Sequence, residues 1–223
     1  MALAQLQAHW RLKVLLSAIF NLIFWSGYEL LGRHAFFPLH ELPLTWLDRV
    51  IPYQPQPWGW IYLSQFSFTS LLPWLLSTRN DVLRCTLGLA VMSAISFSVF
   101  LFFPVAAPAR IDAQGHLAMN VIAVYDGPLN CFPSLHAAYL FYMAGLGWRL
   151  FGNVAPSIVI GLSLIWGASI LYATIATRQH YALDLVAGAA VGCFSYWLAW
   201  KGATRAAFTM PLKNGAMSHE GTR

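Results

Sequence analysis

The chain has 223 residues, of which 58% are hydrophobic and 9% are charged, and its formal net charge is +5 at pH 7. This composition excludes an ordinary soluble domain and an intrinsically disordered chain, and it is typical of a protein whose main solvent is lipid. The basic residues are spread around the ends of apolar runs rather than gathered in an aromatic-interleaved patch. Their distribution favours membrane topology and anionic lipid over nucleic acid as a partner.

Six apolar runs are each about as long as the hydrocarbon core of a bilayer requires. In chain order they are residues 14–31, 58–76, 85–103, 134–151, 155–177 and 181–200. The pattern predicts an all-α integral membrane protein in which residues 1–200 form a six-transmembrane-helix bundle. Residues 201–223 are polar and weakly basic with too few apolar side chains to pack, so we expect a disordered cytoplasmic tail.

The first run follows Arg11 and Lys13, as the apolar part of a cleaved signal peptide would. The run is long, however, and its end at residues 28–31 lacks a small-x-small cleavage site. We therefore expect it to be retained as the first span.

Two long loops separate the early runs. Residues 33–57 contain five prolines, which break helical continuity and predict a structured interfacial loop. This loop is either a lid over a site or a connector with its Trp and Tyr side chains among the lipid headgroups, and we favour the connector. The second loop, residues 104–132, contains Arg110, His116 and Asp126. His116 and Asp126 could assist catalysis, but isolated polar residues in a loop are usually solvated.

The fourth run begins with a short motif, Pro133-Ser134-Leu135-His136. Proline is suited to the first turn of a helix, where free N–H groups and the positive end of the helix dipole bind anions. The motif is therefore a place to hold a phosphate, although Ser134 alone could be a plain helix cap.

The sixth run begins with a second motif, residues 178–184, which contains Arg178, His180 and Asp184. His180 and Asp184 are four residues apart, so on a helix they share one face, and the carboxylate can orient the imidazole. Each residue alone has a plainer explanation, an interfacial histidine or a helix cap. Together with the first motif they point to a nucleophile, its orienting carboxylate and a phosphate site.

These residues resemble the type 2 phosphatidic acid phosphatase superfamily, whose signature has a Pro-Ser-x-His block and a later block ending in His-x-x-x-Asp. Leu135 stands where the commonest form has Gly, as in the branch that contains inositol-phosphate transferases alongside bacterial lipid phosphatases. The usual Arg six residues before the nucleophilic His falls on Thr174, and Arg178 looks like its basic substitute. The first family block survives loosely in residues 103–110, where Arg110 is the matching cation.

The resemblance implies a role for each residue of the site. His180 would attack phosphorus and form a phosphohistidine, Asp184 would hold His180, and His136 would protonate the leaving group and later activate water. The resemblance also implies phosphate binding by Arg178, Arg110 and Ser134. No cofactor is expected and no metal is needed, because the sequence shows no ligand cluster and the three cysteines have neither metal spacing nor a disulfide framework.

Counting spans places both motifs on the same membrane face. The opposite face would hold nine of the basic residues, namely Arg11, Lys13, Arg79, Arg84, Arg149, Lys201, Arg205, Lys213 and Arg223. The positive-inside rule then predicts cytoplasmic termini and a site outside, which in a bacterial inner membrane is the periplasmic face.

The expected function is a membrane lipid-phosphate phosphatase that hydrolyses a phosphomonoester or pyrophosphate of a lipid. A lipid phosphotransferase that passes the group to an alcohol acceptor needs the same intermediate and is the alternative. A proton- or ion-coupled transporter is a further alternative, but it predicts ionisable groups at the bilayer midplane or inverted repeats. The sequence leaves the lipid and the oligomeric state open.

Overall fold

The computed structural model describes residues 2–108 and 115–203. Arg110 and residues 204–223 of the expected tail lie outside the described residues, and so do the side chains of residues 2–3 and 67–69.

The described part of the chain is helical, as the apolar runs predict. Its helices are α1 (Ala2–Gln7), α2 (Trp10–Arg33), α3 (Trp46–Val50), α4 (Trp58–Thr69), α5 (Arg79–Phe102), α6 (Leu117–Tyr125), α7 (Leu135–Phe151), α8 (Pro156–Ala176) and α9 (Ala182–Trp200), with a 3₁₀ turn η1 at Leu72–Leu75. The two long loops of the prediction contain the short helices α3 and α6. The all-α prediction is confirmed.

Four helices, α2, α5, α8 and α9, are long and apolar enough to cross a membrane. The second predicted run is divided, because α4 ends at Thr69 and η1 resumes at Leu72 with Pro73 in its first turn. Proline has no N–H to donate and disfavours helix in the residue before it. The fourth run forms helix α7, which has 17 residues and is shorter than α2, α5, α8 and α9. The chain is an integral membrane protein, and residues 2–108 and 115–203 contain four such candidate spans.

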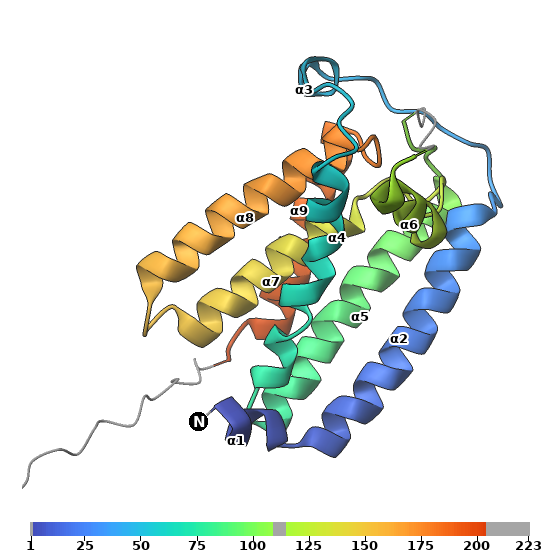
Figure 1. Ribbon diagram of the computed structural model, residues 1–223. Helices are drawn as coiled ribbons and strands as arrows, with labels where there is room; N and C mark the ends of the chain where they lie inside the picture. The colour runs from blue at the N-terminus through green and yellow to red at the C-terminus, as the bar shows by residue number, and fades with distance from the viewer. Residues whose placement is uncertain (1, 109–114, 204–223) are drawn as a thin grey trace, which may run out of the picture.

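Helix α7 lies in the middle of the bundle, where it packs against α9, α8 and α4, while α5 packs against α9 and α2 (Figure 1). The close approach of α7 and α9 depends on two glycines. A Cβ on Gly188 would lie 3.0 Å from the Cβ of Ala137, and a Cβ on Gly192 would lie 2.9 Å from the Cα of Ala138. Their spacing predicts this packing role.

The two long loops gather at one end of the bundle, the end opposite α1 (Figure 1). His40 of the first loop receives a hydrogen bond on its carbonyl from the N–H of Ala106 (3.0 Å), and Val105 forms backbone bridges with both His40 and Asn130. Both motifs lie at this end because Asn130 leads into α7, and because the N–H of Gln54 donates to the carbonyl of Ala176 at the end of α8 (2.8 Å).

Candidate active site

The first motif begins α7 with a serine cap. The helix starts at Leu135, and the Oγ of buried Ser134 accepts a hydrogen bond from the N–H of Ala137 at 3.3 Å. Pro133 therefore precedes the cap, and its predicted place in the first turn is wrong. If Pro133 were the first helical residue, Phe132 would be the cap residue and would offer the free N–H groups no side-chain acceptor, whereas Ser134 offers its hydroxyl.

The second motif differs from its prediction in the same way. Helix α9 starts at Ala182, so His180 lies before the helix and Asp184 lies in the first turn. The two do not share a helical face. They still meet, because Asp184 Oδ2 turns back to accept a hydrogen bond from the N–H of Tyr181 (2.7 Å) and then lies 3.4 Å from Nδ1 of His180.

The imidazole of His180 is held on one side only. Its Nδ1 lies 2.9 Å from the carbonyl oxygen of Cys131 and 3.4 Å from the carboxylate of Asp184. Both neighbours are acceptors, so Nδ1 carries the proton and Nε2 carries the lone pair. Nε2 is buried and has no hydrogen-bond partner among the described residues.

The imidazole of His136 is held in a similar manner. Its Nδ1 lies 3.1 Å from the hydroxyl of Tyr62, and its buried Nε2 has no partner in the described part of the chain. The His136 and His180 rings have centroids 5.6 Å apart. Buried polar atoms are nearly always hydrogen-bonded, so two such atoms on neighbouring rings indicate a place for a polar ligand.

Asp126 lies beside the site, although the sequence favoured a solvated loop residue over a part in catalysis. It is buried, and its carboxylate accepts hydrogen bonds from the hydroxyls of Tyr28 and Tyr62. Burial alone would raise its pKa, but His136, His180 and the two tyrosines favour the carboxylate and together lower the pKa. The expectation of a solvated Asp126 is wrong. No local pattern could have revealed it, because its partners are 98 and 64 residues away in sequence.

Cys131 is a neighbour of His180 whose contacts the sequence did not reveal. Its thiol donates to Asp184 Oδ2 at 2.8 Å and lies 3.6 Å from Nδ1 of His180. Burial, followed by the charge of Asp184, raises the pKa of the thiol well above its usual value. Cys131, His180 and Asp184 offer three metal-ligating atoms within 4.8 Å of one another. The expectation that the chain has no ligand cluster is therefore wrong, because the cluster forms from two segments that the fold brings together.

Arg178 lies close in sequence to His180, but its side chain binds the first long loop. Its Nη1 donates to the carbonyl of Asp48 (2.8 Å) and its Nη2 to that of Ile51 (3.3 Å). The carboxylate of Asp48 in turn accepts the N–H of Ala182 (2.8 Å), at the start of α9. These three hydrogen bonds join the loop 33–57 to the site end, in addition to the bond from Gln54 to the carbonyl of Ala176.

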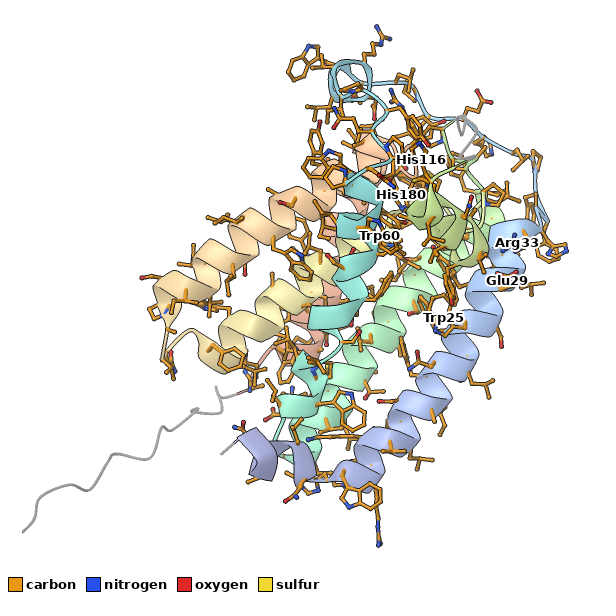
Figure 2. All side chains as sticks on the ribbon, in the orientation of Figure 1. Trp25, Glu29, Arg33, Trp60, His116 and His180 are labelled. Carbon is orange, nitrogen blue, oxygen red and sulfur yellow. The ribbon has the colours of Figure 1, made fainter. Side chains whose placement is uncertain are left out.

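Thr174 and His116 are the remaining positions that the sequence singled out. The buried Thr174 gives its hydroxyl to the carbonyl of Leu171 (2.7 Å), so this position holds no cation. His116 is half-buried at the start of α6, at the same end of the molecule as His180 (Figure 2). The structure thus brings together Ser134, His136, His180 and Asp184, and it directs Arg178 to the loop.

A cavity of about 340 Å³ opens beside His136. Tyr62, Asp126 and His136 line it near the site. Lys13 in the first turn of α2 and Trp74 in η1, which the Lys13 ammonium group contacts, also line it. Its other walls are mostly apolar side chains of α2, α4 and α5, among them Leu16, Phe20, Phe24, Leu63, Leu89 and Met92. The cavity therefore extends the site into the apolar part of the bundle.

The chain belongs to the PAP2 superfamily, because the model of that family matches residues 39–198 and includes both motifs. Members of this class are phosphatase-like enzymes of phosphoryl transfer, which act on phosphate esters. Comparison with curated proteins and with solved structures found no match.

Proposed function

We propose that this membrane enzyme is a lipid-phosphate phosphatase that hydrolyses a phosphomonoester or pyrophosphate of a lipid through a phosphohistidine on His180. The observation that carries the proposal is the pair of buried Nε2 atoms on the adjacent rings of His180 and His136, which have no hydrogen-bond partner in residues 2–108 and 115–203. A phosphoryl group between them would have a nucleophile on one side and a proton donor on the other.

In the first half-reaction, Nε2 of His180 attacks phosphorus in line with the leaving oxygen. Asp184 and the carbonyl of Cys131 keep the proton on Nδ1, which leaves the Nε2 lone pair for the new N–P bond. The P–O bond to the lipid breaks, and Nε2–H of His136 gives its proton to the departing oxygen. The products are phosphohistidine and a lipid alcohol, or a lipid monophosphate when the substrate is a pyrophosphate.

In the second half-reaction, His136 accepts a proton from water, and the resulting hydroxide oxygen attacks phosphorus. The N–P bond breaks, inorganic phosphate leaves, and His180 regains its lone pair. His136 is then protonated again, as the next cycle requires.

The charge of the phosphoryl oxygens needs cationic or N–H partners. The first-turn N–H groups of α7, beside the cap Ser134, supply one set. We assign Arg178 and Arg110 as the cations. In this proposal the Arg178 guanidinium gives up a hydrogen bond to a loop carbonyl and donates to a phosphoryl oxygen instead.

The cavity supports a lipid substrate over a soluble phosphate ester. His136 protonates the leaving oxygen, so the leaving group lies on the His136 side, and His136 is the histidine that lines the cavity. The apolar walls fit the hydrocarbon chain of a departing lipid alcohol, whereas a soluble sugar or nucleotide would leave them without a partner.

We further propose a six-span topology in which α4 with η1, and α7, complete the set of spans α2, α5, α8 and α9. This arrangement has cytoplasmic termini and an external, in bacteria periplasmic, site. It also supports the enzyme over a transporter, because His136, His180 and Asp184 lie at helix starts, whereas a transporter would place them at mid-membrane.

Hydrolysis is favoured over transfer because neither long loop is long enough to establish a second specific site for an acceptor. The test supplies a panel of lipid phosphates to the detergent-solubilised protein, with and without inositol or glycerol, and follows both inorganic phosphate and new headgroup lipid. Phosphate release at the same rate without acceptor supports the hydrolase. Turnover only with acceptor, and headgroup lipid as the product, contradicts it.

A further inference from the structure

The cluster of Cys131, His180 and Asp184 has the dimensions of one face of a zinc site. Zn²⁺ binds thiolate sulfur at about 2.3 Å and imidazole nitrogen or carboxylate oxygen at about 2.0–2.2 Å, so tetrahedral ligand atoms lie about 3.4–3.6 Å apart. Nδ1 of His180 lies 3.4 Å from Asp184 Oδ2 and 3.6 Å from the sulfur of Cys131. Two of the three separations already fit.

The third separation is shorter because it is a hydrogen bond. The thiol of Cys131 donates to Asp184 Oδ2 at 2.8 Å, and a metal that replaced this proton would require the two atoms to move to about 3.6 Å apart. A second feature also favours a cation. Oδ1 of Asp184 has no hydrogen-bond partner among the residues described. Such an atom is unusual in a side chain that is fully buried.

We propose that Cys131, His180 and Asp184 form an inhibitory site for Zn²⁺. A thiolate and an imidazole select a thiophilic metal. Mg²⁺ and Ca²⁺ prefer sets of six or more oxygen ligands, which this cluster does not offer.

Binding blocks the nucleophile through the tautomer of His180. The metal takes the lone pair of Nδ1, so the proton of the neutral ring must reside on Nε2, and the thiol proton of Cys131 passes to solvent. With a proton on Nε2 the ring has no lone pair for attack on phosphorus. Inhibition therefore rests on the proposed function, whereas binding does not.

The binding experiment titrates the purified, detergent-solubilised protein with Cd²⁺, whose bonds to thiolate absorb in the ultraviolet. The chain has three cysteines, and we compare the wild type with single variants of each. The expected band is lost in Cys131→Ala and retained in Cys85→Ala and in the exposed Cys193→Ser. Cys131→Ser keeps the size and a hydroxyl donor, and it must lose the band as well. A band that survives both Cys131 variants overturns the site.

The activity experiment measures inhibition by Zn²⁺, with each variant compared with its own rate in chelator. Loss of an outer-shell partner already weakens a metal site roughly 10–100-fold, so loss of the sulfur ligand in Cys131→Ser should raise the inhibiting Zn²⁺ concentration at least tenfold. Cys193→Ser should match the wild type.

The two experiments separate the two proposals. A wild type that binds Cd²⁺ through Cys131 but releases no phosphate from any lipid contradicts the proposed function and leaves the metal site standing. A wild type that releases phosphate but shows no thiolate band, or that binds metal without losing activity, overturns the inhibitory site.

Discussion

At the residue scale, the two ring nitrogens of His180 have different roles. Nδ1 is bound by Asp184 and the Cys131 carbonyl, and Nε2 is left for a substrate. The neighbouring His136 repeats this division, with Tyr62 and Asp126 on its Nδ1 side. Each histidine is therefore oriented by a carboxylate, directly for His180 and through a phenol for His136.

Removal of the proposed nucleophile, His180, gives the first prediction. His180→Ala should lower phosphate release by at least about 10³-fold, because no other described side chain has a lone pair in its place. Thermal unfolding and circular dichroism should show an intact fold. His116→Ala, at the same end of the molecule, is the matched control and should keep full activity.

Full activity in His180→Ala would end the phosphohistidine proposal. Asp184→Asn should also lose much of the rate, since an amide cannot stabilise the imidazole as a carboxylate does. Its effect should not add to that of His180→Ala.

The phenol between Asp126 and His136 gives the second prediction. Tyr62→Phe removes the hydroxyl that orients His136 and should lower kcat roughly tenfold or more, a part of the 10²–10⁴ that a general acid contributes. KM should change little, because Tyr62 holds the acid rather than the phosphate. Tyr142→Phe is the control, since its hydroxyl bonds the carbonyl of Cys85 inside the bundle.

A double variant separates orientation from general loss of stability. If Tyr62 and Asp126 act as one unit, Asp126→Asn should add little to the kcat loss of Tyr62→Phe. Additive losses would show that the two residues act independently.

The carboxylate of Asp126 gives a prediction about pH. Its pKa is lowered in the folded protein, so its stabilisation is complete above the unfolded value of about 3.9 and is lost only as pH falls through the lower folded pKa. The wild type should therefore exceed Asp126→Asn by the same unfolding free energy, about 1–3 kcal/mol, at about pH 7 and about pH 5.5. A difference that shrinks at the lower pH would contradict a lowered pKa.

At the element scale, the contact between α7 and α9 brings the two motifs together. The N–H of Ser134 donates to the carbonyl of Asp184 at 3.1 Å, which joins the start of one helix to the start of the other. Gly188 and Gly192 allow this approach because a side chain at either position would meet the backbone of α7.

The glycine contact gives the next prediction. Gly192→Ala should lower the free energy of unfolding in detergent by about 1–3 kcal/mol, because its Cβ overlaps Ala138. Gly161→Ala in α8 is the matched control. A Cβ there meets nothing within 4 Å, so the substitution should be neutral or slightly stabilising. Equal effects of the two substitutions would show that the helices can separate without cost.

The elements also show what the sequence could predict. Apolar length predicts where the long helices lie, apart from the break in the second run, and local motifs single out His136, His180 and Asp184 as candidates. Each of these signals lies within a few neighbouring positions. The contacts of Asp126 and Cys131 were missed because they join distant segments. The helical face expected for His180 and Asp184 was wrong because spacing alone does not say where α9 starts.

At the scale of the whole molecule, the cavity connects the site to the interior of the bundle. Leu89→Trp should narrow the cavity and lower kcat/KM for a long-chain alkyl phosphate by at least about tenfold, while a short-chain alkyl phosphate keeps its rate. Leu87→Trp, on the exposed side of the same helix, should leave kcat/KM unchanged for both the long-chain and the short-chain phosphate. Equal losses for both chain lengths in Leu89→Trp would place the hydrocarbon chain elsewhere.

The attachment of Arg178 has a consequence for how freely the first loop can change in evolution. Arg178 binds the carbonyls of Asp48 and Ile51, and a carbonyl is present whatever the side chain. Ile51 can therefore be replaced by other apolar residues, which keep the carbonyl acceptor and the packing of this side chain against the buried cluster of Ala137, Ile175, Ala182 and Leu185. Asp48 cannot, because its carboxylate also binds the N–H of Ala182. In relatives of this chain, changes among apolar residues should accordingly be tolerated at position 51, whereas changes at position 48 should be resisted.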